Sequence, residues 1–532
     1  MAVQLKTTAP RDPVRKRTGR RSGGRAARLL SKQGSSASLS IMPGLSGGTY
    51  APLSQCDMER IHETALDVLE NIGVAGPIPR LREAALKRGC RISESGRLLF
   101  PRALVEDCIA GTPKTAHYLS RDGNRDLELS GHRVHFDPGG EAISTLEVGA
   151  NTYRPSTLID LYDFARLTDK LEHLDSFGKV VVPTEIADHR AHDINTAYAM
   201  LAGTCKHVEL NFTHTRHMDD ALDMLHLITG GANAYRDRPF CSTGGCPVVS
   251  PLGFGEDNSD VCIDAHRLFS PTSVIIAPQA GATAPAALAG TLVQAIAETL
   301  AALLLVQLTT PGHPVLFGVW PFVSDLRTGA FSGGGGEQAL LAAAATQIAN
   351  FYGLPCSVGA GMTDSKAVDN QAGYERGITT VLAALAGSNV ISEVGGMMGS
   401  LLGCSFEAIA IDNEMLGMVR RILRGIEVTD ETLSYHVIED VVYGAGHYLG
   451  HPQTLDLMGS EFLYPTLADR KSPEEWEENG SHDIRKKARE CVRSILSSHY
   501  PLHIDPSTDK VLRDRFPIQL PEEAMTAASG RW

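Results

Sequence analysis

The chain lacks several signatures that would assign it directly to a protein class. None of its ten cysteines stands in a CxxC pair, and a zinc module would need thiolates or imidazoles at close ligand spacing. No GxGxxG follows the first strand of the regular pattern, which argues against a dinucleotide-binding fold. The start of the chain lacks the apolar core of a secretory signal peptide. Scattered cysteines without an export signal predict reduced thiols and a cytoplasmic protein.

The chain also has little positive charge beyond its first residues. It carries 49 Lys or Arg against 62 Asp or Glu, a net charge of −13. Residues 1–40 hold ten Lys or Arg against one Asp, a charge of +9, which leaves −22 for the rest. An acidic body of this size repels phosphates, so nucleic acid is not expected as a partner.

The basic start, residues 1–48, is rich in Arg and Ser and poor in apolar residues. This composition predicts a disordered tail. It also overlaps with that of organelle transit peptides, and it would suit an anionic surface, so both alternatives stay open.

Long hydrophobic runs are scarce. The longest, Ala284 to Leu308, is interrupted by Gln294, Glu298 and Gln307. Such a segment suits a helix buried in a large domain better than a membrane span, so no membrane segment is expected.

A regular alternation of strands and helices is the main pattern that the chain does contain. Seven buried, β-branched strands are each followed by a helix, which predicts parallel pairing. We expect an α/β fold, a TIM-type (β/α)8 barrel, with the eighth strand among the lead-in strands (His117–Ser120, Arg133–Asp137) or just after Arg424. The seven predicted strands are Gly178–Val182, His207–Phe212, Phe240–Thr243, Ser273–Ala277, Pro314–Val319, Cys356–Val358 and Asn389–Glu393.

The regions around the alternation predict the remaining organisation. Residues 49–150 form an α+β N-terminal lead-in and residues 151–428 the barrel. Residues 429–512 form a helical C-terminal extension, and residues 513–532 a flexible tail. Such an extension would suit a homo-oligomer, although nothing in the sequence requires one.

The stretch from Leu354 to Gly396 is the strongest candidate for a functional site. A short strand ends in a glycine-rich turn and a polar loop with Asp364 and Lys366, and a second strand ends at Glu393 and two glycines. Strand ends that open into polar loops carry the chemistry of α/β barrels. A surface turn is the alternative for Asp364 and Lys366.

Other candidate motifs have simpler interpretations. Cys241 and Cys246 are spaced unusually for zinc and have no HxH or HxC beside them, so buried or loop cysteines are favoured and no metal is expected. Gly333–Gly336 lacks the GK[ST] ending of a phosphate-binding loop and suits a flexible loop or lid. Trp320 at a strand end is more often a packing residue, yet aromatic faces beside carboxylates also suit a quaternary ammonium.

Four segments together carry a family resemblance: Gly281–Ala301, Gly353–Glu375, Ala384–Ile391 and Gly446–Leu455. In combination they resemble the trimethylamine–corrinoid methyltransferase family, from about Leu53 to about Leu512. The resemblance implies a TIM-type barrel that moves a methyl group from a methylated amine to the cobalt of a separate corrinoid (cobalamin) protein, as in methanogenesis-type one-carbon metabolism. Trimethylamine-specific members insert pyrrolysine, whose counterpart we would place near Asp364–Asp369, and this chain has only the twenty common residues. It therefore resembles the non-pyrrolysine branch, similar to glycine betaine–corrinoid methyltransferases.

The chemistry implied by this resemblance needs no tightly bound cofactor. A quaternary amine is already an activated methyl donor, and the chain has no DxHxxG corrinoid motif, so cobalamin is expected on a partner protein. We expect Asp364, Lys366 and Glu393 as catalytic residues. The expected substrate-binding residues are His135, Phe136, Asn211, Phe212, Gln279, Trp320 and Phe322. Two alternatives stay open: a barrel that binds amines without catalysis, and methyl transfer from a tertiary amine or a methylated sulfur compound.

Overall fold

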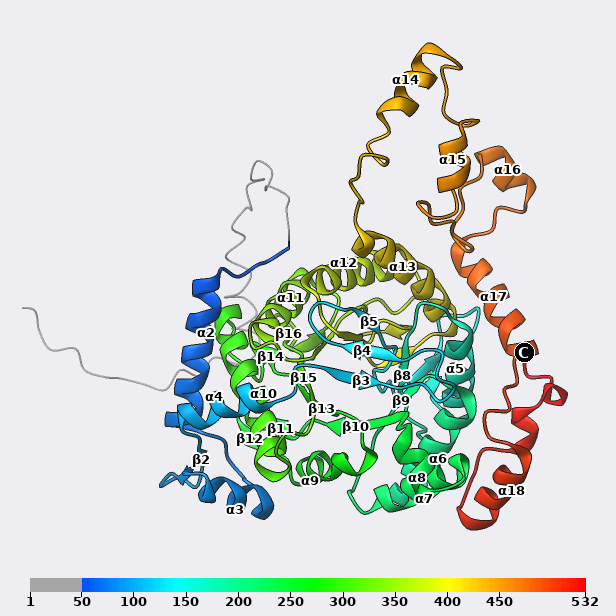
Figure 1. Ribbon diagram of the computed structural model, residues 1–532. Coiled ribbons are helices and arrows are strands. Elements are labelled where there is room, and N and C mark those ends of the chain that lie inside the picture. The colour runs from blue at the N-terminus through cyan, green and yellow to red at the C-terminus, as the bar shows by residue number, and fades with distance from the viewer. Residues whose placement is uncertain (1–49) are drawn as a thin grey trace, which may run out of the picture. The chain divides into compact units, whose positions relative to one another are not determined.

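A computed structural model describes residues 50–532, so the predicted basic tail at 1–48 lies outside the described residues. Eight parallel strands form one sheet, in the order β5-β19-β18-β15-β13-β10-β9-β8. The predicted (β/α)8 architecture is confirmed, and the eighth strand comes from the lead-in, as the two-residue strand β5 (Figure 1). The strands are β5 His135–Phe136, β8 Ser176–Gly178, β9 His207–Leu210, β10 Cys241–Gly245, β13 Thr272–Ile276, β15 Val315–Val319, β18 Cys356–Gly359 and β19 Val390–Ser392.

The sheet closes between β5 and β8 through side chains as well as backbone. The Asp137 carboxylate accepts from Ser176 Oγ at 2.6 Å and from the Gly178 amide at 2.9 Å. The Asp175 carboxylate accepts from the Phe136 amide at 2.9 Å, and Ala142 pairs with Val181 as an isolated parallel bridge. Strand β5 is too short to close the barrel with a regular ladder, so carboxylates supply part of the seam.

Each strand is followed by a helix, and these helices surround the sheet (Figure 1). They are α5 Leu158–Lys170, α6 His189–Gly203, α7 His217–Thr229 with α8 Ala232–Asp237, α9 Glu256–Asp264, α10 Leu288–Thr309, α11 Gly336–Phe351, α12 Asn370–Ala386 and α13 Phe406–Arg424. Caps at their starts match the sequence: Thr157, Asp188, Asp369 and Ser405 each accept a bond from the first turn.

Helix α10 is, among the described residues, the one helix long and apolar enough to cross a membrane, and 78% of it is buried inside the protein. Its buried Glu298 accepts from Ser250 Oγ at 2.6 Å and from the Leu252 amide at 2.7 Å. A buried core helix, as the sequence predicted, explains both its apolar composition and this bonded carboxylate.

The lead-in covers one side of the barrel and closes its amino-terminal end. It consists of α2 Gln55–Asp67, a π-helical turn Val68–Ile72, α3 Pro79–Lys87, the pair β1 Arg91–Ile92 and β2 Leu98–Leu99, α4 Arg102–Gly111, and the hairpin β3 Ala116–Tyr118 with β4 Leu127–Leu129. The Tyr118 ring of this hairpin stacks on His207 with centroids 3.9 Å apart. Because His207 begins β9, the hairpin plugs the barrel at the start of its strands, and the opposite end is left to the loops.

Small additional sheets follow the carboxyl ends of the barrel strands. One contains β14 Gln279–Ala280, β16 Phe322–Asp325 and β17 Ala330–Ser332. Another contains β20 Met397–Met398, β21 Gly403–Cys404, β6 Ser144–Leu146 and β7 Tyr153–Pro155, and β11 Val248–Val249 pairs with β12 Gly253–Phe254. These sheets make the rim around the open end.

After α13 the chain leaves the barrel as an arm, residues 425–464, and returns (Figure 1). The arm carries α14 Tyr435–Tyr443 and α15 Pro452–Leu457. At its base, Arg421 and Arg424 both bind the Glu461 carboxylate, at 3.0 and 3.1 Å. The arm is therefore anchored where it departs and where it comes back.

The remaining C-terminal helices are α16 Pro473–Glu478, α17 Ile484–Ser498 and α18 Pro506–Arg515. Helix α17 packs on α13 and α5, and its Arg485 and Arg489 bind the buried Glu407 at 2.9 and 2.8 Å. Residues 513–532, which we expected to be a flexible tail, place Leu520 in the core and Arg531 on Asp163.

Candidate functional site at the barrel mouth

Glu393 lies at the carboxyl end of β19, where the sequence predicted a catalytic carboxylate. Its side chain is buried, its φ of 71° is left-handed, and its Oε2 atom has no hydrogen-bond partner among the described residues. Burial alone raises the pKa of Glu393 well above its ordinary value. A buried, unsatisfied carboxyl group on a strained backbone is costly, and such groups concentrate at ligand sites.

Two aromatic side chains face the same point as Glu393. A Cβ built on Gly359 would lie 2.5 Å from Glu393 Oε2, 2.9 Å from Phe322 Cζ and 3.0 Å from Trp320 Cε3. These three groups therefore converge over a residue that has no side chain. The aromatic–carboxylate cluster is defined here as Trp320, Phe322 and Glu393.

The aromatic rings are held in place by their neighbours. Trp320 Nε1 donates to Ser357 Oγ at 3.1 Å, inside the barrel. Phe322 meets Phe331 edge-on, with centroids 5.0 Å apart, and Trp320 meets Phe322 at 6.4 Å. Since Trp320 follows β15 and Phe322 begins β16, two rim elements fix the ring geometry.

A second carboxyl group, Glu209, projects into the barrel from β9. It accepts from Ser273 Oγ at 3.0 Å, and Tyr118 Oη donates to it at 3.4 Å. Burial, with the nearby charge of Asp137, raises the pKa of Glu209 to about 7. Near neutral pH this group is therefore divided between its charged and neutral forms.

Cys246 lies near both carboxyl groups, Glu209 and Glu393. Its thiol is exposed to solvent, yet burial among Glu141, Glu209 and Glu393 raises its pKa to about 12. Lys179 binds Glu141 there at 3.3 Å, so one cation stands at an otherwise acidic entrance.

Asp364 and Lys366 lie in the loop after β18, beside a cavity of about 1040 Å³ on the rim. Asp364 accepts from the Gly333 amide and Ser400 Oγ, both at 2.7 Å, and from Ser332 Oγ at 2.5 Å. Lys366 Nζ donates to the Asp364 carbonyl at 2.6 Å. Asp364 thus joins the rim loops to one another, and Lys366 reaches the cavity. Phe331 lines the same cavity and links its wall to the aromatic–carboxylate cluster.

Several residues predicted for the pocket lie elsewhere. Phe136 is buried under the helix layer, with the Arg420 guanidinium of α13 at 5.6 Å from its ring. His135 Nε2 lies 3.1 Å from the Glu128 carbonyl of the plugging hairpin, at the closed end of the barrel. Phe212, by contrast, lies in the same hydrophobic cluster as Trp320 and Phe322 and, like Trp320, is 8% exposed. Strand β5 has only two residues, so His135 and Phe136 stand at its start as well as at its end, and their role in binding stays a prediction.

Asn211 and Gln279 stay closer to their predicted surroundings. Asn211 follows β9 by one residue and is half-buried. Gln279 Oε1 accepts from Ser324 Oγ at 3.0 Å and thereby ties β14 to β16. Glu185, another rim carboxylate, accepts from the Leu158 amide and caps α5.

Sequence reasoning missed Glu209, Tyr118, Lys179 and Glu141. Glu209 had a usable signal, because a charged residue at an inward position of a buried strand is unusual. Tyr118 had none, since only the folding of the lead-in hairpin into the barrel brings it there.

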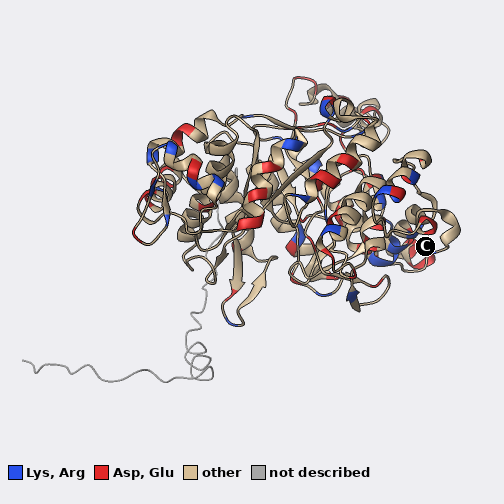
Figure 2. Cartoon of the chain, turned by 90° about the horizontal axis from the view of Figure 1, so that it is seen from below, with Lys and Arg blue, Asp and Glu red and all other residues tan. Residues whose placement is uncertain are grey.

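Charged residues of both signs occur over the described chain. In Figure 2 no continuous basic face is visible from the side shown. The described residues carry a net charge of −22, because the first 40 residues hold +9 of the total of −13.

Comparison with known proteins gives a consistent assignment. The family described as "Trimethylamine methyltransferase (MTTB)" matches residues 21–518. The chain is 32% identical over 468 residues to trimethylamine methyltransferase MttB of Desulfitobacterium hafniense, covering 87% of this chain and 92% of that protein. It is 29% identical to a glycine betaine methyltransferase of Desulfitobacterium hafniense, covering 87% and 96%. A solved structure of a hydroxylamine complex of MtmB aligns with a TM-score of 0.48 at 13% identity, covering 88% of this chain and 91% of that one. The chain therefore belongs to the trimethylamine methyltransferase family.

Proposed function

We propose that this protein moves a methyl group from a quaternary amine, such as glycine betaine, to the cobalt of a corrinoid carried by a separate protein. The observation that carries the proposal is the unpartnered carboxyl group of Glu393 beside Trp320 and Phe322. A quaternary ammonium has no N–H to donate, so aromatic faces and a nearby negative charge are the groups that bind it. The relatives are named for trimethylamine and glycine betaine, which fits a methylated nitrogen compound.

The residues at the mouth divide the work of binding. Glu393 supplies negative charge at the mouth, and Glu209 supplies it from inside the barrel. Trp320 and Phe322 supply ring faces. Lys179 and Lys366 are the cations available for the carboxylate of a betaine. Binding a cation favours the ionised form of both carboxyl groups, so the substrate would lower the pKa values that burial has raised.

The chemical step that we infer is a displacement at carbon. The N–CH3 bond breaks, its electron pair stays on nitrogen, and a neutral tertiary amine leaves. Co(I) of the partner's corrinoid supplies the electron pair for the new Co–CH3 bond. The protein contributes orientation of one methyl group and exclusion of water, and no proton needs to move.

The rim is the surface on which a corrinoid protein would dock. The β16–β17 hairpin, the loop with Asp364 and the turn at Ser400 surround the large cavity there. We further infer that the protein acts in the cytoplasm, where reduced corrinoid and free thiols persist.

The test is a methyl-transfer assay with purified protein and a corrinoid protein reduced to Co(I). Glycine betaine and trimethylamine are supplied in separate reactions, and methylcobalamin formation is followed by absorbance. Methylation from glycine betaine supports the proposal, and methylation from trimethylamine alone would reassign the substrate to a tertiary amine. Binding of betaine without methylation would favour a non-catalytic amine-binding protein.

A matched pair of variants locates the activity at the proposed cluster. Glu393→Gln keeps the side-chain volume and removes the charge, so kcat/KM should fall roughly 100-fold or more. Glu185→Gln changes a rim carboxylate that caps α5 and should leave kcat/KM within about twofold. Equal effects in the two variants would contradict the assignment of Glu393.

We also infer that the protein forms a homo-oligomer through its arm. Large apolar side chains on the arm are exposed, including Ile426 (88%), Tyr443 (87%) and Leu449 (83%). An arm with this many large exposed apolar side chains favours an interface, and a second copy offers the same side chains in return.

A further inference from the structure

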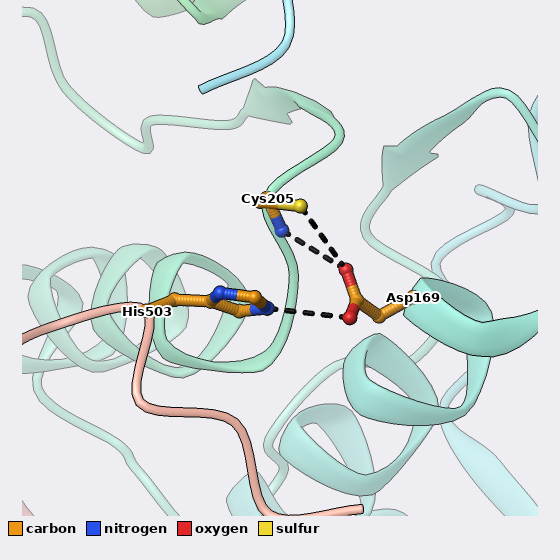
Figure 3. A group of neighbouring side chains, drawn as sticks. All are labelled: Asp169, Cys205 and His503. Carbon is orange, nitrogen blue, oxygen red and sulfur yellow. Dashed lines mark hydrogen bonds and ion pairs between the residues drawn. The ribbon is translucent and has the colours of Figure 1, made fainter. Parts of the chain in front are cut away.

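A cluster of metal-binding side-chain types lies at the closed end of the barrel, far along each strand from the mouth. Asp169 ends α5, and Cys205 stands two residues before β9. His499 and His503 follow α17 in the C-terminal segment. Figure 3 shows Cys205 and His503 approaching the Asp169 carboxylate from two different elements.

The donor atoms of this cluster already lie near ligand spacing. Those of Asp169, Cys205 and His503 are all within 4.8 Å of one another. Asp169 Oδ2 lies 2.9 Å from His499 Nε2 and 3.3 Å from His503 Nε2, and Asp169 Oδ1 lies 3.6 Å from Cys205 Sγ. Ligands of tetrahedral zinc, at about 2.0–2.3 Å from the metal, are separated from one another by roughly 3.2–3.7 Å. Asp169, Cys205 and His503 thus form a compact set of three donors, and His499 reaches the same carboxylate.

The chemistry of the four donors suits zinc better than a hard cation. One thiol, two imidazoles and one carboxylate are a set that Zn²⁺ accepts, whereas Mg²⁺ and Ca²⁺ require oxygen ligands. Neutral histidines present Nε2 lone pairs, and the HxxxH spacing of His499 and His503 matches the second half of many zinc sites.

The surroundings orient the carboxylate, and its ion-pair partners are His499 and His503 rather than a lysine or an arginine. Asp169 Oδ1 also accepts from Thr204 Oγ1 at 2.9 Å and from the Cys205 amide at 3.1 Å, bonds that also orient carboxylates bound to metals. The nearest lysine, Lys206, donates instead to the carbonyls of Thr168, Leu171 and Leu174. Arg121 and Arg125 likewise donate to backbone carbonyls.

The thiol is placed among negative charges that a cation would compensate. Cys205 Sγ lies 3.5 Å from Asp122 Oδ2 as well as near Asp169. A bound zinc ion would stabilise the thiolate, and the thiol proton would leave to solvent.

We propose that Asp169, Cys205, His499 and His503 bind one Zn²⁺ ion that fastens the C-terminal segment to the base of the barrel. The site is separate from the mouth, so the ion is structural and takes no part in methyl transfer. It joins α5, the start of β9 and the chain after α17, three segments that otherwise meet through hydrogen bonds.

The test uses the full-length protein, stripped with a chelator and then dialysed against Zn²⁺. Elemental analysis should find about one zinc per chain, and thermal unfolding should shift upward on zinc addition. With Co²⁺ in place of zinc, the protein should show a thiolate-to-cobalt charge-transfer band. Wild-type protein that retains less than roughly 0.1 zinc per chain and shows no such band would overturn the proposal.

Variants separate the site from adventitious binding. Cys205→Ser should abolish the cobalt charge-transfer band, and His503→Gln should lower zinc retention at least tenfold. Cys56→Ser, an exposed thiol on α2, should change neither. If a site variant does not fold, alkylation of wild-type Cys205 decides, because bound zinc should slow it at least tenfold. Equal alkylation rates with and without zinc would refute the site.

Discussion

At the scale of single residues, the two carboxyl groups inside the barrel have different surroundings and different uses. Glu209 is bonded to Ser273 and Tyr118, whereas the Glu393 Oε2 atom has no partner among the described residues. Glu209, which is hydrogen-bonded in the free protein, adjusts the charge of the site. Glu393, whose Oε2 atom lacks a hydrogen-bond partner, is available to a ligand.

Glu209 predicts a pH-dependent affinity for glycine betaine. Its raised pKa of about 7 means that it is mostly neutral below pH 7 and mostly ionised above it. Because the ionised form attracts the ammonium, and glycine betaine does not titrate in this range, the dissociation constant should fall as pH rises through 7. Calorimetric titration at roughly one pH unit on either side of 7 measures this.

The control for this prediction is Glu209→Gln, which should flatten the pH profile. Glu141, Glu393 and Asp137 also face this region, and a profile unchanged in Glu209→Gln would transfer the titration to one of them.

Trp320 predicts a specific loss of cation affinity. Trp320→Leu removes the ring face and should raise the dissociation constant for glycine betaine roughly tenfold, the size of a desolvated cation–π contact. Trp320→Phe should recover part of that loss. Ser357→Ala removes only the hydrogen bond to the indole and should cost less than Trp320→Leu; the reverse order would place the ring outside the binding site.

At the scale of elements, strand β5 decides how the barrel closes. It pairs with β19 over two residues, and Asp137 then bridges to β8 by accepting from Ser176 and Gly178. The Asp137 carboxylate also accepts locally from the Gly139 amide. A strand of this length cannot hold the seam by backbone bonds alone, so the carboxylate replaces part of a ladder.

Asp137→Ala should therefore lower the free energy of unfolding by about 3 kcal/mol, since two buried donors and one partly buried donor lose their acceptor. Urea denaturation followed by circular dichroism gives the value. Asp430→Ala, in the exposed arm, should change stability by less than about 0.5 kcal/mol. A seam variant as stable as this control would show that the barrel closes without the carboxylate.

At the scale of the whole molecule, the arm at 425–464 exposes large apolar side chains to solvent in a single chain. Its helices α14 and α15 bury little apolar surface, and only its base is anchored, by Arg421 and Arg424. A segment of this kind gains stability by packing on another copy.

The double variant Tyr443→Ser/Leu449→Ser should dissociate the oligomer, because it replaces two exposed apolar side chains of the arm with polar ones. Light scattering after size-exclusion chromatography should show a mass near the 57.0 kDa of one chain. Tyr374→Ser, an equally large exposed residue on α12, should leave the oligomer intact. A wild-type protein that already runs as a monomer would contradict the inference.

The sequence alone determined most of the architecture and part of the site. Strands and helices repeat their side-chain pattern about every 2 and 3.6 residues, so each element can be predicted from a short stretch of sequence. Trp320, Phe322 and Glu393 were identifiable because each stands at the end of such a strand. The domain boundaries and the roles of these site residues stay predictions.

Only the tertiary structure decided what lies between segments that are distant in the chain. The sequence offered several candidates for the eighth strand, and only the fold selected β5, which lies within Arg133–Asp137. Tyr118 reaches Glu209 only because a hairpin folds into the barrel. Asp169 and His503 are 334 residues apart, so no local spacing could have joined them. The sequence determines which side chains are present. Contact between remote residues depends on the packing that closes the barrel and places the C-terminal segment against its base.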